Sequence, residues 1–415
     1  MSAASAAPTD WFSLALGVDG DRAAELQRRR TETPVQRLAA LGPGGPDTWV
    51  VYRHNDAAAV LADERRFSLS IVEERYGAVL GRSMITLTPA ARRALRRIVG
   101  ERLRPDSSDL AAVVNDVVAA RVDAVAATAT VPQAADVGAA VPAAGPHAGR
   151  WDPVDLVPLL AAQVPARVIA RLLGLPEGEW APIAQLAAAA ARLLEEPRAA
   201  LRAARSLRRR LAAEVRARGG GAADDLVGAL NAARFDSRRL EPEEAIASLL
   251  LLAWAGTETT SPAIAGAVHA LLAHPDQTAA VRADPRLAEA AVDEALRWES
   301  PVQVTSRRAL VDIELGGTVV PAGATVLVHI GAANRDERRF FRPDDYDLAR
   351  PERGCHLAFG HGSHRCLGWR LARAEVETCV RMLLDRFPCL ALAPSCPPPE
   401  GEVVRSPRRL LVCPW

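Results

Sequence analysis

The sequence predicts a mainly α-helical protein of one domain, with small β-sheets in the later part of the chain. Apolar residues recur at helical spacing through most of the 415 residues, nearly half of which are hydrophobic. Residues 242–274 predict one continuous helix of roughly 45–50 Å, long enough to cross a whole domain. Residues 302–330 alternate and carry two glycine turns, as short strands do. We find no internal repeat and no clear linker, so we expect a single domain over residues 1–415.

The first half of the chain alternates short elements with breaks. Residues 49–52 predict a strand, and residues 56–62 predict the helix that follows it. Further helices are expected over residues 89–103, 164–173 and 184–215, and from Asp224 onward. Residues 128–149 are rich in alanine, proline and glycine without a clear period, so we expect a flexible loop there.

The second half contains the longest helices. Pro242, followed by acidic residues, starts the long central helix. A helix over residues 287–298 is stopped by Ser300 and Pro301. After the short strands, Cys366 opens a last helix that runs to about Phe387.

Composition and charge exclude several classes of protein. The net charge of +1 gives no sign of nucleic-acid or anionic-membrane binding. The start of the chain has no basic segment followed by a long apolar run, and no uncharged apolar stretch reaches about 18 residues. The six cysteines form no C-x-x-C pair, which argues against a zinc site of the usual spacing. We expect a cytoplasmic, monomeric protein with reduced thiols.

The segment F-G-H-G-S-H-R-C-L-G, residues 359–368, concentrates histidine, cysteine and glycine. Metal ligation, a nucleophilic thiol and a plain turn are all compatible with these residue types. Gly360 and Gly362 permit positive φ and a close approach of the backbone to another group. Cys366 lies where the loop becomes a helix, a position that favours the thiolate. Such a thiolate can be an axial ligand of heme iron, and Gly368 leaves room for a flat macrocycle.

The whole segment resembles the heme-binding signature F-G-x-G-x-H-x-C-x-G of the cytochrome P-450 family. The similarity covers the chain from roughly residue 30 to its end and suggests a bacterial-type member. It implies the fold of that family, with the long central helix lying over a heme b group. It also implies that Cys366 is the iron ligand and that Phe359, Gly360 and Gly368 belong to the heme-binding loop.

A second motif, Ala255-Gly256-Thr257-Glu258-Thr259-Thr260, lies in the long helix. The Thr259 hydroxyl can donate to the carbonyl of Ala255 one turn earlier. Pro262 lacks an N–H, so the helix should kink or bulge here, and Gly256 leaves space for a ligand as small as O2. The motif resembles the family's oxygen-binding A-G-x-[D/E]-T-[T/S], which implies that Glu258 and Thr259 deliver protons.

Two further sets of residues match family positions. Glu294 and Arg297 form an E-x-x-R pair on one helix face, and Arg350 is the expected third member of this structural group. The resemblance implies that His364, Arg307, Arg92 and Arg96 bind the heme propionates. Arg92 stands where the family usually has histidine, but its guanidinium also suits a carboxylate.

The expected activity is insertion of one oxygen atom from O2 into a small apolar molecule, through hydroxylation in secondary metabolism. The resemblance implies electrons from a ferredoxin and an NAD(P)H-dependent ferredoxin reductase. Arginines are expected to form the basic docking face: Arg92, Arg93, Arg96, Arg97, Arg365, Arg370 and Arg373. The expected substrate pocket contains Leu251, Leu252, Trp254, Ala255, Val302, Gln303, Val304, Val403 and Val404, covered by residues 71–88. Two alternatives stay open: a peroxide-driven peroxygenase and a non-enzymatic heme-binding or scaffold protein.

Overall fold

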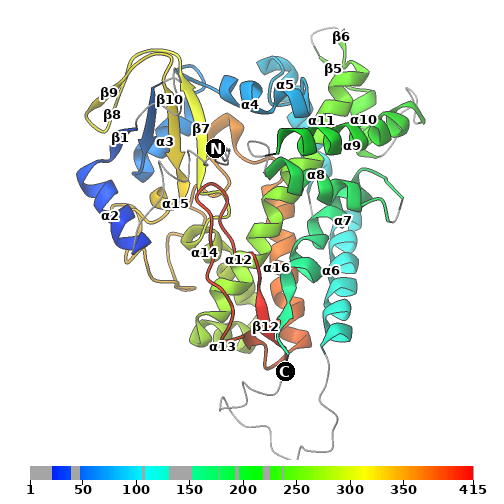
Figure 1. Ribbon diagram of the computed structural model, residues 1–415, viewed down its shortest axis with the longest axis vertical. Helices are drawn as coiled ribbons and strands as arrows, with labels where there is room; N and C mark the ends of the chain where they lie inside the picture. The colour runs from blue at the N-terminus through cyan, green and yellow to red at the C-terminus, as the bar shows by residue number, and fades with distance from the viewer. Residues whose placement is uncertain are drawn as a thin grey trace, which may run out of the picture.

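The computed structural model describes residues 21–38, 47–104, 108–129, 152–176, 178–191, 196–217, 225–235 and 238–414. Most of residues 128–149, the expected flexible loop, lies outside these ranges, as does the glycine triplet at 219–221. The described chain is mainly α with small sheets, as predicted. Figure 1 shows the larger sheet with α3 on one side of the molecule and the long helices on the other.

The helices cover most of the described chain. They are α2 (Arg22–Glu32), α3 (His54–Ala62), α4 (Ser70–Leu80), α5 (Pro89–Arg102), α6 (Ser108–Thr128), α7 (Gln163–Leu172), α8 (Ala181–Ala191), α9 (Pro197–Ala217), α10 (Leu226–Asn231), α11 (Pro242–Glu258), α12 (Thr260–Leu272), α13 (Pro275–Ala283), α14 (Ala288–Trp298), α15 (Ile330–Ala333) and α16 (Trp369–Arg386), with a π-helix η2 (Val157–Ala161) and 3₁₀ turns η3 (Pro285–Leu287) and η4 (Gly362–His364). Two expected helices differ from the prediction. The range 184–215 contains parts of two described helices, α8 and α9, and the long central helix is two helices, α11 and α12.

The strands form one five-stranded sheet and three small ones. They are β1 (Val35–Leu38), β2 (Thr48–Val51), β3 (Phe67–Ser68), β4 (Val154–Asp155), β5 (Arg234–Phe235), β6 (Arg238–Arg239), β7 (Val304–Ala309), β8 (Ile313–Leu315), β9 (Thr318–Val320), β10 (Thr325–His329), β11 (Ala391–Leu392) and β12 (Leu411–Cys413). The main sheet has the order β1-β2-β10-β7-β3, and only the β2–β10 pair is parallel. Strands from residues 35–68 and from residues 304–329 therefore meet in one sheet.

Local sequence signals explain where the functional helices begin. Pro242 is the first residue of α11, and Glu241 and Glu244 form a reciprocal capping box with the backbone. Thr88 caps α5, where it accepts from the Ala91 N–H, and Pro89 follows at the first helical position. Both α11 and α5 are thereby fixed at their N-terminal ends, and both carry predicted site residues.

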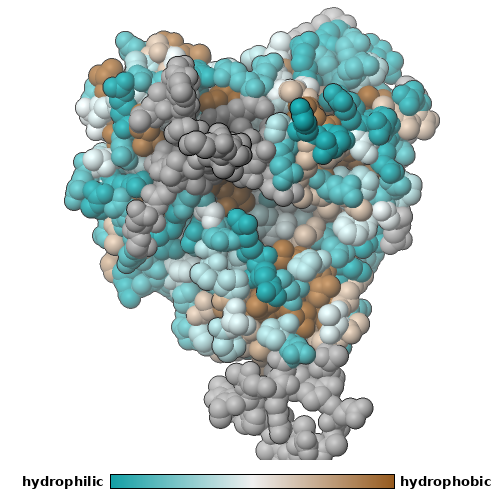
Figure 2. All heavy atoms as spheres, viewed as in Figure 1, coloured by the Kyte–Doolittle hydropathy of each residue, from teal (hydrophilic) through white to brown (hydrophobic). Residues whose placement is uncertain are grey.

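The surface view shows mostly hydrophilic side chains on the visible face, with apolar patches scattered between them (Figure 2). Within the described ranges, no helix has both the length and the apolarity to cross a membrane.

Candidate active site

The loop before α16 is a tight hairpin that presents Cys366. The Cys366 N–H donates to the Phe359 carbonyl at 2.8 Å, closing the loop. Gly360 and Gly362 have φ values of +70° and +72°, which a side chain would strain. At Gly362 an added Cβ would lie 2.6 Å from the Cα of Ala62 at the end of α3. The glycines therefore allow both the turn and its close packing against α3.

The Cys366 thiol sits among protein atoms but stays accessible to solvent. Burial raises the pKa of this thiol, while the N–H of Gly368 and the charges of Arg96 and Arg365 act in the opposite direction. Helix α16 begins at Trp369, three residues after the expected start, so Cys366 precedes the helix. Among the described residues, no three histidine, cysteine or acidic side chains cluster as a metal-ion site. The loop thus offers one sulfur, with backbone N–H groups and cations near it.

Basic side chains gather beside this loop. Burial and the charges of Arg92 and Arg307 lower the pKa of His364 to about 4. Arg307 is buried, and burial lowers its pKa to about 10; the only hydrogen bond seen for it in the described chain goes to the carbonyl of Ser306. Arg96 donates to the Arg365 carbonyl at 2.7 Å. Buried cations of this kind need an anionic partner.

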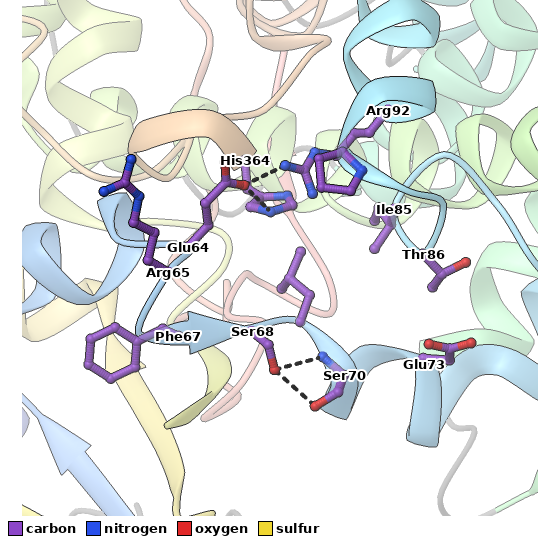
Figure 3. Close-up of a pocket in the computed structure, with 12 residues that line it drawn as sticks. Glu64, Arg65, Phe67, Ser68, Ser70, Glu73, Ile85, Thr86, Arg92 and His364 are labelled. Carbon is purple, nitrogen blue, oxygen red and sulfur yellow. Dashed lines mark hydrogen bonds and ion pairs between the residues drawn. The ribbon is translucent and has the colours of Figure 1, made fainter. Parts of the chain in front are cut away.

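A cavity of about 440 Å³ opens next to this cationic cluster (Figure 3). Its lining comes from the segment that follows α3, from β3, α4, the segment between α4 and α5, α5 and η4: Glu64, Arg65, Phe67, Ser68, Leu69, Ser70, Glu73, Ile85, Thr86, Pro89, Arg92 and His364. Two of the four expected propionate ligands, Arg92 and His364, therefore face one cavity. Sequence reasoning missed Glu64, whose carboxylate Figure 3 shows joined by dashed lines to both of these residues.

The central helix breaks where the second motif predicted. The Thr259 hydroxyl donates to the Ala255 carbonyl at 3.0 Å, and Thr259 separates α11 from α12. The following helix carries Pro262, which cannot donate to the Glu258 carbonyl. Ala255 is exposed although most of its helix is buried, so this side of the break faces open space.

Glu258 is half-buried at the same break. Burial raises the pKa of its carboxyl to about 7, against a smaller opposing effect from the nearby Trp254 indole. A carboxyl with this pKa can both give and take a proton near neutral pH. A Cβ added at Gly256 would lie 2.8 Å from Ile169 on α7, so this glycine lets α7 and α11 pack closely. The expectation that Gly256 also makes room for O2 stays a prediction.

The E-x-x-R pair forms a buried triad with Arg350. Glu294 accepts from Arg297 at 2.7 and 2.8 Å and from Arg350 at 3.0 Å. Arg297 also donates to the carbonyls of Asn334 and Pro343. Because all three charged groups of the triad are buried and hydrogen-bonded, the triad joins α14 to the segment before the cysteine loop.

The expected substrate-pocket residues have different environments. Leu251 and Val304 are buried and Leu252 is half-buried. Trp254 packs against Tyr76 of α4, with ring centroids 4.9 Å apart and the rings tilted by 37°. Val302 pairs with Val404 in a β-bridge, and the Val403 carbonyl accepts from the backbone N–H of Gln303.

Gln303 is not free to contact a substrate, contrary to our expectation. Its amide donates to the Ser300 carbonyl at 2.6 Å and accepts from Arg22 at 3.2 Å. The side chain is almost completely buried, with 2% exposure. Its polar atoms tie α2 to the end of α14 instead.

The expected docking arginines are also divided. Arg93, Arg97, Arg365 and Arg370 are exposed, and Arg373 pairs with Glu289 on α14. Arg92 is buried, so it does not belong to the surface, where it was expected. His356, to which the sequence assigned no role, lies 3.3 Å from Asp293.

The residues present fit a heme group. Ala255 on α11 and Cys366 in the cysteine loop are both exposed. A flat ligand bound between the helix and the loop would cover both residues. Its propionates would meet the buried cations Arg307 and Arg92; the Nε of Arg92 is buried without a hydrogen-bond partner in the described chain. The space beside Gly368 is open, because a Cβ added there would approach only Leu103, at 3.9 Å.

The fold and the residues gathered at the site fit a heme-dependent oxygenase, and comparisons with known proteins agree. The family model for cytochrome P450 matches residues 186–414. The chain is 36% identical to the cytochrome P450 monooxygenase PikC of Streptomyces venezuelae, over 96% of this chain and 91% of that protein. It is 33% identical to 6-deoxyerythronolide B hydroxylase of Saccharopolyspora erythraea, over 89% and 88%. The structure of cytochrome P450 PksS of the Bacillus subtilis 168 bacillaene polyketide synthase superposes with a TM-score of 0.80 at 26% identity, covering 94% and 96%.

The chain belongs to the cytochrome P450 family, as the resemblance implied. It is a bacterial P450 monooxygenase with the P450 fold, and the family implies a heme-iron cofactor. This assignment overturns the alternative of a non-enzymatic protein.

Proposed function

We propose that the protein hydroxylates a small apolar organic molecule in secondary metabolism, with heme b as cofactor. The observation that carries the proposal is the pair formed by an accessible Cys366 and a helix break at Thr259 beside the raised-pKa acid Glu258. Two relatives support the reaction and its setting by name: one is a hydroxylase and one belongs to a polyketide synthase.

Cys366 would hold the heme iron, and the buried arginines with His364 would hold the propionates. A thiolate-ligated heme supplies the activation of O2 and the insertion of one oxygen atom. The protein's own residues then have separate tasks. Glu258 carries protons inward from solvent, and Thr259 positions a proton donor at the break in the helix. Leu251, Leu252 and Val302 supply apolar walls that exclude water and orient the substrate.

Electrons come, in this proposal, from a ferredoxin reduced by an NAD(P)H-dependent reductase. The exposed Arg93, Arg97, Arg365 and Arg370 lie on α5, the cysteine loop and the start of α16, where a basic surface would attract an acidic partner. The peroxide-driven alternative is less favoured, because that reaction does not need the acid and alcohol pair that this chain has.

The first experiment tests the ligand. Reduced protein exposed to carbon monoxide should show the red-shifted Soret band from which the family takes its name, and Cys366→Ser should abolish it. Survival of that band in Cys366→Ser would refute the assignment. Cys396→Ser, a change at a half-buried cysteine that donates to the Pro397 carbonyl, is the matched control.

The second experiment tests the reaction. Candidate metabolites are screened for the spectral shift that accompanies substrate binding, and products are analysed with a surrogate ferredoxin system. We expect Thr259→Ala to lower product formed per NADPH by about tenfold or more while substrate binding persists, since proton positioning contributes at least 100-fold in many enzymes. Turnover with hydrogen peroxide and none with ferredoxin would overturn the proposal.

A further inference from the structure

Glu64, which no motif singled out, occupies the centre of the cationic cluster. It lies two residues beyond α3 and forms an ion pair with Arg92 on α5. The same carboxylate accepts from the Ser363 hydroxyl at 2.9 Å and lies 3.7 Å from Nε2 of His364. Figure 3 shows Glu64 pointing toward both Arg92 and His364 at the edge of the cavity. One acidic side chain thus joins α5 to the cysteine loop.

Arg92 is only partly satisfied by this contact. Its Nη2 donates to Glu64, but its Nε is buried and has no hydrogen-bond partner among the residues described. A buried donor without an acceptor is costly, and guanidinium groups commonly serve two acceptors at once. Arg92 therefore has a donor available for a second carboxylate within the same cavity.

The positive charges of the site require an additional negative charge, which Glu64 supplies. Three arginines act on His364 by their charge at the proposed propionate end, namely Arg92, Arg96 and Arg307. Each guanidinium contributes one positive charge. Two propionates neutralise only two of them. A neutral histidine at position 92, as the family usually has, would leave two arginines for two propionates. The arginine at this position adds one positive charge, and Glu64 supplies the matching negative charge.

We infer that Glu64 is a positioning residue for the propionate end of the heme, which compensates for the arginine at position 92. Its carboxylate orients the Arg92 guanidinium so that Nε–H is left for a propionate. Through Ser363 it also links the cysteine loop to α5. This inference rests on the proposed heme site, in which Cys366 is the ligand.

The test is a double-mutant cycle on the heme-loaded protein, with Arg92→His, Glu64→Gln and both changes together. The readouts are the rate of heme transfer to excess apomyoglobin and the midpoint reduction potential. Arg92→His leaves the Glu64 carboxylate beside the propionates without its cation, so heme transfer should be about tenfold faster, a coupling typical of shared ion-pair networks. The midpoint potential should fall, because the negative charge disfavours electron uptake. Glu64→Gln in the Arg92→His background should restore both values to near those of the starting protein.

Glu64→Gln alone should raise the midpoint potential, because it leaves Arg92 unopposed. Glu73→Gln is the matched control, since Glu73 lines the same cavity and is exposed, and it should change neither readout. If the double variant loses heme as fast as Arg92→His, or if its midpoint potential stays as low as that of Arg92→His, the inference is wrong. If Arg92→His fails to load heme, the double variant should load it again, and a double variant that also fails to load heme would contradict the inference. Failure of the proposed heme site is a different result, because the starting protein would then lack the red-shifted carbon monoxide band.

Discussion

Replacing Glu258 by glutamine should stabilise the folded protein at alkaline pH while impairing its chemistry. Burial raises the pKa of this carboxyl from 4.5 to about 7. Well below pH 4.5 the Glu258 carboxyl is protonated in both the folded and the unfolded states, so its ionisation does not change the free energy of unfolding. Between pH 4.5 and 7 the unfolded chain ionises first, and above pH 7 the folded protein carries the full penalty of a buried charge. Each unit of pKa difference corresponds to about 1.4 kcal/mol, so the penalty above pH 7 is about 3 kcal/mol.

The assay is chemical denaturation of heme-loaded protein at pH 5 and pH 8. Glu258→Gln should exceed the unchanged protein in free energy of unfolding by about 3 kcal/mol at pH 8 and by less than about 1 kcal/mol at pH 5. The same variant should form less product per NADPH, because an amide cannot relay a proton. Glu314→Gln, at an exposed acid on β8, should show neither effect. A stability difference that is the same at both pH values would refute the account of Glu258 as a buried, neutral acid.

Gly362→Ala should lower the free energy of unfolding by about 2–4 kcal/mol, because the added Cβ combines a φ of +72° with a backbone clash. The control Gly354→Ala, at a φ of +73° in open space, should lower it by only about 1 kcal/mol. Thermal unfolding of the two variants compares these values directly. Arg350→Ala should cost about 3 kcal/mol, because it removes the hydrogen bonds that the buried Arg350 donates to Glu294 and to the carbonyls of Phe341 and Asp345. A loss below about 1 kcal/mol would contradict the structural role of the triad. Arg97→Glu should slow the reduction of the heme protein by ferredoxin about tenfold at low ionic strength. Stopped-flow measurements should show this difference in rate shrinking at high salt. Equal slowing at all salt concentrations would argue against docking on α5.

Local rules predicted the elements that carry the chemistry. The break in the central helix follows from a threonine that bonds back to Ala255 and from Pro262 three residues further on, and both act within one or two turns. The turn of the cysteine loop follows from glycines at positive φ. The fold class and the strands of residues 302–330 follow from periodicity, which a single sequence shows directly.

Local rules did not predict boundaries that depend on packing. Residues 184–215 have one helical pattern, but the structure has two helices there, α8 and α9, each packed on α11 and on the other. Gly256 illustrates the same limit: the sequence shows that the position is small, and only the structure shows that Ile169 is the neighbour requiring it.

Which polar side chains are free for chemistry depends on contacts between distant parts of the chain. Gln303 has the residue type of a substrate contact, but Arg22, 281 positions earlier, and the Ser300 carbonyl engage its amide. Glu64 lies in a charged segment that resembles any solvated turn, but Ser363, 299 positions later, brings it to the cysteine loop. Gln303 and Glu64 differ in whether a buried polar atom at the site lacks a hydrogen-bond partner. Both functional groups of Gln303 are hydrogen-bonded, whereas the partner of Glu64 retains a buried Nε–H with no acceptor among the described residues. Leaving a buried donor without an acceptor is costly, and in our proposal a heme propionate is the acceptor that completes Arg92.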